Sequence, residues 1–401
     1  MRDVADALAL DAPRPLGTHR LEHAGALALF GVAGALQFSI AAAQILLTIA
    51  LICWVAVLVI RRERFEAPSF FWPLLAYAGA TLVSAAFSSD PRASIVDSKQ
   101  LVLFLLVPLT YRFVSSARAH TLTTVVLACA VASAVFGIVQ YGIFHYDQLG
   151  QRPQGTLGHY MTYSGLLMIV SGVAIARVLF GPRDRTWALL MLPAMFAALA
   201  LTFTRSAQVG MCAAAALLFA LKDFRLFAIV PVVAAIFFAV APGQITQRFV
   251  SMFDQKDPTR IDRMTMAHIG ERMIVRHPLT GVGPNMVQRT YEEYRGSDPA
   301  AGPDGVVHIN PHLHNNPLQI AAERGLPALA IWLWFIVVLA RDLQKRFAAG
   351  PHRALAAAAL ASMAALLIAG LFEYNFGDSE VLMLFLIIVT LPAAADRLVD
   401  A

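Results

Sequence analysis

The stretch AGALALFGVAGALQFSIAAAQILLTIALICWVAVLVI, residues 24–60, decides the fold, because it contains 37 consecutive residues without an acidic or basic side chain. As a single helix rising about 1.5 Å per residue it would be roughly 55 Å long, whereas the hydrocarbon core of a bilayer is about 30 Å thick. The stretch therefore predicts two short membrane-spanning helices.

The composition of the whole chain agrees with a membrane protein. Of its 401 residues, 58% are hydrophobic and only 14% are charged, and the mean hydropathy is +0.64. The hydrophobic runs are apolar all round, unlike the alternating strands of a membrane β-barrel. Cys53, Cys129 and Cys212 lie inside such runs and indicate packing residues, neither disulfides nor metal ligands. The fold class is therefore predicted to be all-α.

For the same reason of length, residues 187–221 divide into two spans around Arg205. Eight further apolar segments lie near residues 70–87, 98–114, 121–142, 160–180, 226–242, 317–340, 354–371 and 381–396. The sequence thus predicts a polytopic protein with about 12 transmembrane helices, and an even number places both termini on one side.

The basic residues follow the positive-inside rule if both termini are cytoplasmic. The short outside loops then contain only Arg92, Arg152 and Arg205. The inside loops contain 14 basic residues: Arg61, Arg62, Arg64, Arg112, Arg118, Arg177, Arg183, Arg185, Lys222, Arg225, Arg341, Lys345, Arg346 and Arg353. The formal net charge of +5 is thus explained by topology, and no nucleic-acid partner is implied.

This topology divides the chain into five parts. Residues 1–23 are a cytoplasmic N-terminal segment, residues 24–241 contain spans 1–9, residues 242–316 form a large outside loop, residues 317–396 contain spans 10–12, and residues 397–401 are the cytoplasmic C-terminus. Within the loop, residues 261–276 read as an amphipathic helix on the membrane surface. Residues 277–284 read as a tight turn and residues 294–307 as a flexible excursion.

Histidines gather where this loop meets the tenth span, in His308-Ile-Asn-Pro-His312-Leu-His314. Asn315 or Asn316 can cap the helix that follows and so fix the direction of His314. A neutral imidazole there can act as a general base, and a capped interfacial histidine without catalytic work is the plain alternative. A metal site is a third reading, although only Asp304 accompanies the three histidines.

Arginines are the second candidate group on the outside. Arg205 follows an apolar run directly, a costly place for a charge without a partner, and its planar fork suits a phosphate. Snorkelling to the lipid headgroups is the alternative for Arg205. Arg263 and Arg152 are further candidates, with a solvated loop position as the alternative for each. Three acidic residues of a later outside loop could orient a histidine or an arginine: Glu373, Asp378 and Glu380.

His314-Asn315, followed by nine residues and Gly325, resembles the periplasmic motif of bacterial O-antigen ligases, within the O-antigen ligase and polymerase superfamily. Arg263, fifteen residues before Pro278 in a stretch similar to that family's His-Pro-Leu-x-Gly-Val-Gly segment, and Arg205 directly after a span add to the resemblance. It implies a protein of the bacterial inner membrane with its active site on the periplasmic face.

The resemblance also implies the reaction and the partners. Such ligases move O-antigen from undecaprenyl diphosphate to a sugar hydroxyl of the lipid A core, among membrane lipids. His314 would be the general base, Arg205 and Arg263 would bind the donor diphosphate, and His312, Arg152, Asn315 and Asp378 could assist in positioning. A diphosphate leaves readily, so we expect one inverting displacement without a metal, a cofactor or a carboxylate pair.

Two relatives share this donor: an O-antigen polymerase, which extends another lipid-linked glycan, and a protein O-oligosaccharyltransferase. A transporter of lipid-linked glycans is the alternative from another class. A transporter would show charges within its spans, whereas the spans here look almost free of acids and bases. Among the three relatives, the modest length without an added soluble C-terminal domain favours an O-antigen ligase.

Overall fold

The computed structural model describes residues 16–148, 150–181, 185–240, 243, 258–296 and 309–397. These residues contain no strand, and an isolated bridge pairs Gln148 with Gln151. The helices are α2 (Leu16–Ala35), α3 (Ile40–Arg61), α4 (Phe71–Ala86), α5 (Pro91–Asp97), the 3-10 helix η1 (Ser98–Leu105), α6 (Leu106–Phe113), α7 (Ser116–Gly142), α8 (Tyr160–Phe180), α9 (Arg185–Leu201), α10 (Arg205–Lys222), η2 (Phe224–Ala228), α11 (Ile229–Val240), α13 (Pro258–Arg276), α14 (Val287–Arg295), α15 (Asn316–Ala349), α16 (Arg353–Ala369) and α17 (Ser379–Asp396).

Six helical segments in the described ranges are long and apolar enough to cross a membrane: Ile40–Arg61, Pro91–Phe113, Ser116–Gly142, Tyr160–Phe180, Asn316–Ala349 and Ser379–Asp396. Three shorter apolar helices, α4, α9 and α16, accompany them. The predicted class, an all-helical polytopic membrane protein, is thereby confirmed. Both long apolar runs divide as expected, into α2 with α3 and into α9 with α10, whereas the number of 12 spans stays a prediction.

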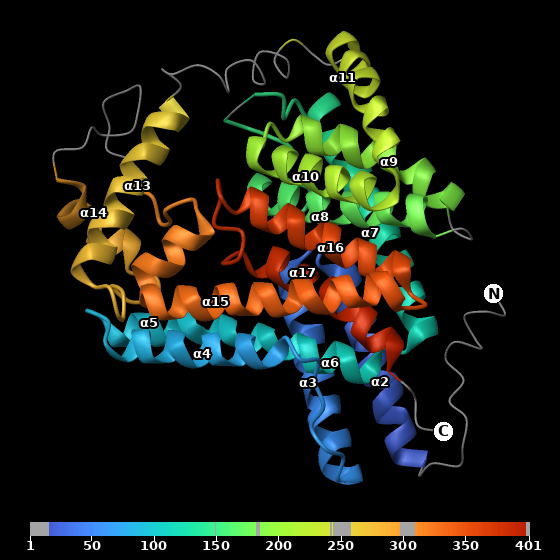
Figure 1. Cartoon of the computed structure of the whole chain (residues 1–401), viewed down its shortest axis with the longest axis horizontal. Coiled ribbons are helices and arrows are strands. Elements are labelled where there is room, and N and C mark those ends of the chain that lie inside the picture. Colours follow the sequence, from blue (N-terminus) through green and yellow to red (C-terminus); the bar gives the residue numbers. More distant parts are fainter. Residues whose placement is uncertain are drawn as a thin grey trace.

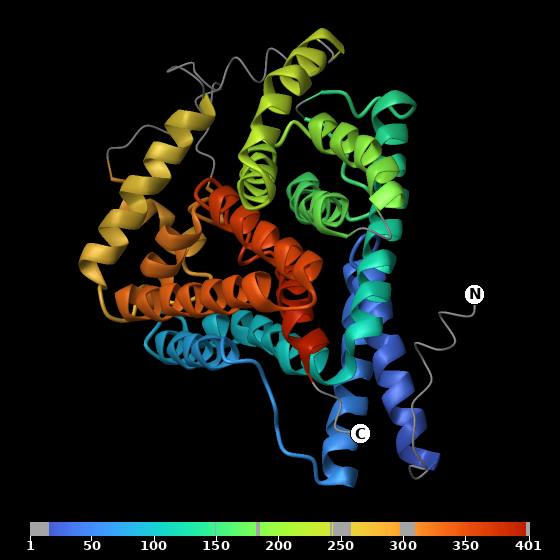
Figure 2. The ribbon, with the colours of Figure 1, turned by 45° about the vertical axis from the view of Figure 1, so that its right-hand side comes forward.

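Helices α8 and α17 form the centre of the bundle (Figures 1 and 2). Every residue from Thr162 to Arg177 and from Val381 to Ala395 is buried, because other helices surround both. Alanine-rich α16 packs against α8, α10, α15 and α17, since its small side chains allow close approach. Long α15 lies along α4 on its other side.

An ion cluster joins four helices at one end of the bundle. Glu22 of α2 accepts hydrogen bonds from Arg61 at 2.6 Å and from Arg112 at 2.7 Å, and Glu63 also pairs with Arg112 at 2.7 Å. Arg397, directly after α17, donates to the carbonyl of Arg112. The start of α2 and the ends of α3, α6 and α17 therefore meet at one place.

The predicted amphipathic helix is α13, and the chain itself covers its apolar residues. Met266, Ile269 and Met273 are fully buried in a second hydrophobic core with Tyr291 and Tyr294 of α14. The expectation that this helix lies with its apolar face on the membrane is therefore wrong. Helix α14 was not predicted, although Val287, Tyr291 and Tyr294 have helical spacing. The flexible excursion expected at residues 294–307 lies largely outside the described residues.

The expected tight turn docks onto a break in α15. Gly325 has φ +82° and ψ +167°, which interrupts α15 and frees the carbonyls before it. The amides of Val282 and Gly283 donate to the carbonyls of Ala322 and Glu323, both at 2.9 Å. A side chain at Gly281 would overlap the backbone of Glu323. Backbone contact between two segments distant in sequence thus fixes the first part of α15, which carries the site.

A buried ion pair lies at the same break, because Arg324 Nη1 and Glu323 Oε2 are 2.8 Å apart. The expectation of spans almost free of charge is therefore incomplete. The two side chains neutralise each other, and Ser84 of α4 donates to the Glu323 carbonyl. This pair therefore lies where α15 is attached to the turn and to α4.

Candidate active site

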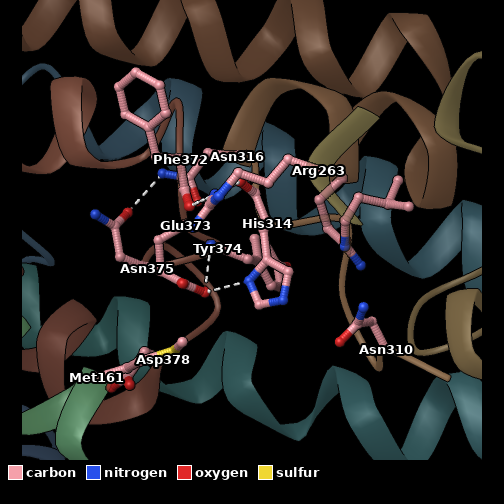
Figure 3. Close-up of polar contacts among 12 residues, drawn as sticks. Met161, Arg263, Asn310, His314, Asn316, Phe372, Glu373, Tyr374, Asn375 and Asp378 are labelled. Atoms are coloured by element: carbon pink, nitrogen blue, oxygen red, sulfur yellow. Dashed lines mark hydrogen bonds and ion pairs between the residues drawn. The ribbon is translucent and has the colours of Figure 1, made fainter. Parts of the chain in front are cut away.

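His314 is held at the start of α15 by its backbone and by a carboxylate. Asn315 caps α15, since its side chain accepts from the amide of Leu318 at 2.8 Å. His314 itself has φ +50°, a strained conformation for a residue other than glycine, and one that is common at functional sites. Its Nδ1 lies 3.0 Å from Oε1 of Glu373, and both side chains are 16% exposed (Figure 3).

Glu373 belongs to the loop between α16 and α17, which several hydrogen bonds attach to the start of α15. Asn316 donates from its side chain to Asn375 at 2.6 Å and from its backbone to the carbonyl of Gly370, also at 2.6 Å. The side chain of Asn315 donates to the carbonyl of Leu371 at 3.0 Å. Because these amides fix the loop, the Glu373 carboxylate is positioned independently of the histidine that it contacts.

Arg263 of α13 bridges the two segments that carry this pair. Its Nη1 donates to the carbonyl of Phe372 and, at 3.4 Å, to the carbonyl of His314. The neighbouring Asp262 accepts from the Asn310 side chain at 2.9 Å. Figure 3 shows Asn310 across the imidazole from Glu373, and the Arg263 side chain reaching toward Phe372. The guanidinium thus stands beside the histidine and holds both backbones.

The electrostatics of the pair favour a charged Glu373. Burial alone would raise the pKa of this carboxyl, but the hydrogen bond from His314, the charge of Arg263 and the amide of Tyr374 outweigh it, so the pKa lies below its usual value. A carboxylate that accepts from Nδ1 leaves Nε2 of the neutral imidazole as the proton acceptor. The arrangement is that of a general base with an orienting carboxylate.

Arg205 is the first residue of α10 and lies near Arg263. Burial lowers the pKa of the Arg263 guanidinium, Glu373 and Asp262 raise it, and the charge of Arg205 lowers it further. The turn before Arg205 is strained, because Phe203 has φ +54°. Close packing of Gly210 against α8 and α16 fixes α10 beside the Glu373 loop. The charge of Arg205 thus acts on Arg263, which donates to the carbonyl of His314.

Arg152 joins this group through Tyr160, the first residue of α8. Its Cζ lies 4.1 Å from the centroid of the Tyr160 ring. Tyr160 raises the pKa of Arg263 as well as that of Arg152, although burial lowers the pKa of both. Tyr160 thus contacts Arg152 and influences Arg263, the arginine that donates to the carbonyl of His314.

The other two predicted positioning residues have structural contacts. His312 packs its ring against Tyr374, with centroids 5.2 Å apart. Burial, followed by the charge of His314, lowers the pKa of His312 to about 4, so its imidazole is neutral. Asp378 caps α17 and accepts a hydrogen bond from Thr162 of α8, and burial raises its pKa. Asp378 thus joins two central helices at the rim of the site.

The predicted alternative of a metal site involves four residues, of which the structure describes only His312 and His314. His308 and Asp304 lie outside the described residues. Among the described residues, no group of three or more histidine, cysteine and acidic side chains could hold a metal ion. The His314 imidazole is instead engaged with Glu373.

Sequence reasoning did not single out Glu373, and it missed Tyr160. Glu373 was one of three acidic candidates in its loop, and nothing in the local sequence separates it from Asp378 or Glu380. Tyr160 could have been noticed in the sequence as an aromatic residue at the first position of a predicted span, eight residues after Arg152. Only the folded chain shows that these residues face the arginines.

The fold and the site define a polytopic helical membrane protein with a histidine–carboxylate pair beside a group of arginines. Residues 189–333 match a family model described as O-antigen ligase, which confirms the resemblance seen in the motifs. The matched segment contains Arg205, Arg263 and His314, but neither Arg152 nor Glu373. The search of curated proteins found no match for this chain. The family match supports an enzyme of the O-antigen ligase or polymerase type that resembles a glycosyltransferase.

Proposed function

We propose that this protein transfers O-antigen polysaccharide from undecaprenyl diphosphate to a sugar hydroxyl of the lipid A core, at the periplasmic face of the inner membrane. The observation that carries the proposal is the His314–Glu373 pair, 3.0 Å apart, with Arg263 bound to the backbone on either side of it. A base next to fixed cations suits attack by a hydroxyl and departure of a diphosphate.

His314 acts on the acceptor. Glu373 accepts a hydrogen bond from Nδ1–H and thereby holds the tautomer in which Nε2 carries the lone pair. As the acceptor oxygen bonds to the anomeric carbon, its proton passes to Nε2. The base and its carboxylate together account for activation of a sugar hydroxyl, whose own pKa is far above neutral.

Arg205 and Arg263 act on the donor. The glycosidic bond breaks as the new bond forms, and its electron pair stays on the diphosphate oxygen. Two guanidinium groups stabilise that charge, and such preorganised cations contribute several kcal/mol to a transition state. A diphosphate needs no general acid to leave, so a single displacement with inversion at the anomeric carbon suffices. No step requires a metal or an organic cofactor.

The topology proposed with this function is twelve spans, with both termini cytoplasmic and residues 242–316 as a periplasmic loop. Helix α17 supports this topology. Asp378, in the same loop as Glu373, caps the start of the helix, and Arg397 of the ion cluster directly follows its end. Its 18 residues give a length of about 27 Å, close to the hydrocarbon thickness. A basic cluster at the opposite end from the site is the distribution that the positive-inside rule requires of a periplasmic site.

The test is product analysis with the purified protein in lipid nanodiscs. One reaction contains an undecaprenyl diphosphate glycan and lipopolysaccharide without O-antigen, and a second contains the glycan donor alone. Glycan-bearing lipopolysaccharide with an inverted linkage, made also in the presence of a chelator, is the expected result. Longer lipid-linked glycans in the second reaction would mean a polymerase. Movement of intact donor across the bilayer of liposomes without either product would mean a transporter.

A further inference from the structure

A hollow of about 480 Å³ lies between α5 and the start of α14, at the end of the molecule that carries α13 (Figure 1). Its volume is within the range of about 300–1,000 Å³ that is usual for ligand sites. Six charged or polar side chains line it: Asp90, Arg92, Asp97, Lys99, Asn285 and Arg289. Three of these are cations, and none belongs to the His314 site. The α5–α14 hollow is therefore a second, separate place where a ligand can bind.

Buried serines fix the two walls of the α5–α14 hollow against each other. Ser94 of α5 donates from its Oγ to the carbonyl of Pro284 at 2.8 Å. Ser88, between α4 and α5, donates to the carbonyl of Val282 at 3.3 Å. A side chain at Gly283 would collide with Ser88, so glycine is what allows the walls to approach. Because these contacts are made within the protein, the hollow is formed before a ligand binds.

The cations of the hollow favour an anionic ligand. Nη1 of Arg289 lies 2.6 Å from Oδ2 of Asp90, and the Arg289 side chain is still 56% exposed. Arg92 and Lys99 are exposed, and neither forms a salt bridge with another residue that the structure describes. Arg92 and Lys99 stand on one wall and Arg289 on the other. A phosphate can accept hydrogen bonds from several cations at once, and it is the group that this set matches.

The position of Lys99 indicates that this phosphate belongs to a lipid. Side chains three residues apart are neighbours on a helix, and in a 3-10 helix such as η1 they lie one above the other. The neighbours of Lys99 are Val96, which is 65% exposed, and Val102, which is 48% exposed. They belong to a segment apolar enough to cross a membrane, so this face contacts hydrocarbon and Lys99 extends to the headgroups. The hollow therefore opens where lipid phosphates lie, in the outer leaflet under the proposed topology.

The other polar groups of the hollow suit a sugar. The phosphate of a simple phospholipid would use the cations alone. Asp97 adds a carboxylate and Asn285 adds an amide, and both groups form hydrogen bonds with hydroxyl groups. Asn285 has φ +59°, a left-handed conformation that asparagine tolerates better than most residues. A sugar phosphate, with its anion and its hydroxyl groups close together, uses both kinds of side chain.

We propose that the α5–α14 hollow binds the phosphorylated sugars at the lipid end of the acceptor and so positions the acceptor for transfer. This inference rests on the proposed function. The hydroxyl that is glycosylated lies at the other end of the core glycan, so its lipid end needs a binding place apart from His314. The amides of Val282 and Gly283 beside the hollow also donate to the carbonyls of Ala322 and Glu323, in the helix that His314 precedes. One rigid connection thus holds the anchoring place and the base.

The kinetic test compares Arg92→Gln, Lys99→Gln and the double variant with Arg276→Gln, an exposed arginine of α13 outside the hollow that is the matched control. Each single variant should raise the acceptor KM about tenfold, because a hydrogen bond to a charged group is lost, and leave kcat and the donor KM within about twofold. Lys99→Arg and the control should keep the wild-type KM. An unchanged acceptor KM in the double variant, or an equal rise in the control, would overturn the inference.

An acceptor whose phosphates have been removed by a phosphatase tests the chemistry of the ligand. Removing the phosphate and removing the cations should have the same effect if the two groups bind each other. We expect the wild type to show a raised KM for this acceptor, and the Arg92→Gln, Lys99→Gln double variant to use both acceptors equally. A double variant that still prefers the phosphorylated acceptor as strongly as the wild type does would mean that the phosphates bind elsewhere.

A binding measurement without donor separates this inference from the proposed function. Labelled lipopolysaccharide without O-antigen is titrated onto the protein in phosphatidylcholine nanodiscs, with and without phosphatidylglycerol. We expect the double variant to bind at least about tenfold more weakly in both. Equal binding by wild type and double variant, with phosphatidylglycerol raising the thermal stability of the wild type alone, would mean that the hollow holds an ordinary phospholipid and would overturn the inference. A wild type that binds through the hollow but transfers no glycan would support the binding site and overturn the proposed function.

Discussion

Oε1 of Glu373 lies 3.0 Å from Nδ1 of His314, although 59 positions separate the two residues in the sequence. The same carboxylate oxygen also accepts from the amide of Tyr374 at 3.1 Å, which fixes its direction. The histidine is therefore oriented by a residue that is itself held in place, as an efficient general base requires.

Replacing Glu373 by glutamine should reduce transfer without unfolding the protein. The amide can keep a hydrogen bond but cannot stabilise the imidazolium that forms when His314 accepts a proton. We expect kcat to fall by about 10- to 1000-fold with little change in donor affinity. Initial rates with matched protein amounts measure this. Glu292→Gln, an exposed acidic residue paired with Arg295, is the control and should keep full activity.

His312 predicts how stability depends on pH. Burial and the charge of His314 lower its pKa to about 4, below the usual value near 6.5. Between pH 6.5 and 4 the unfolded chain therefore binds a proton that the folded protein does not, so stability falls as the pH falls. Relative to pH 7, His312→Gln should lose up to about 3 kcal/mol less stability at pH 4 than the wild type. Denaturant unfolding in detergent at a series of pH values measures the difference, and parallel curves would contradict the half-buried, neutral state of His312.

We expect α15 to tolerate substitution poorly at Gly325. Its φ of +82° with ψ of +167° suits glycine alone, and an added side chain would strike the carbonyl of Leu279. Gly325→Ala should destabilise the protein by about 3 kcal/mol or more and disturb the His314 segment. The control is Gly79→Ala in α4, where an added Cβ meets nothing within 4 Å. Thermal unfolding should separate the two variants clearly; equal midpoints would refute the docked break.

Most of the helices could be predicted from the sequence, because uncharged runs of limited length leave few alternatives in a bilayer. The divisions of residues 24–60 and 187–221 followed from length alone, and both occur. The second hydrophobic core could not be predicted in the same way. Met266, Ile269 and Met273 have the pattern of a surface helix, and only their contacts with Tyr291 and Tyr294 reveal that the chain covers them.

The members of the site could be proposed from the sequence, but their arrangement could not. His314, Arg205 and Arg263 lie within the segment that matches the family model, and Arg263 donates to the carbonyl of His314. The partner of His314 depends on how the loop after α16 attaches to Asn316, a long-range contact without a local signal. The break at Gly325 could not be predicted either. The motif contains this glycine, but its role is explained only by the close packing of the turn at Gly281 against the backbone beside it.

The most direct measurement is single-turnover glycan transfer by His314→Gln and wild type, with donor binding measured on the same samples. We predict that the variant binds the undecaprenyl diphosphate glycan with nearly unchanged affinity and transfers it roughly 100- to 10,000-fold more slowly, as expected when a general base is removed. Transfer at the wild-type rate by a folded, donor-bound His314→Gln protein would contradict the assignment of His314 as the base.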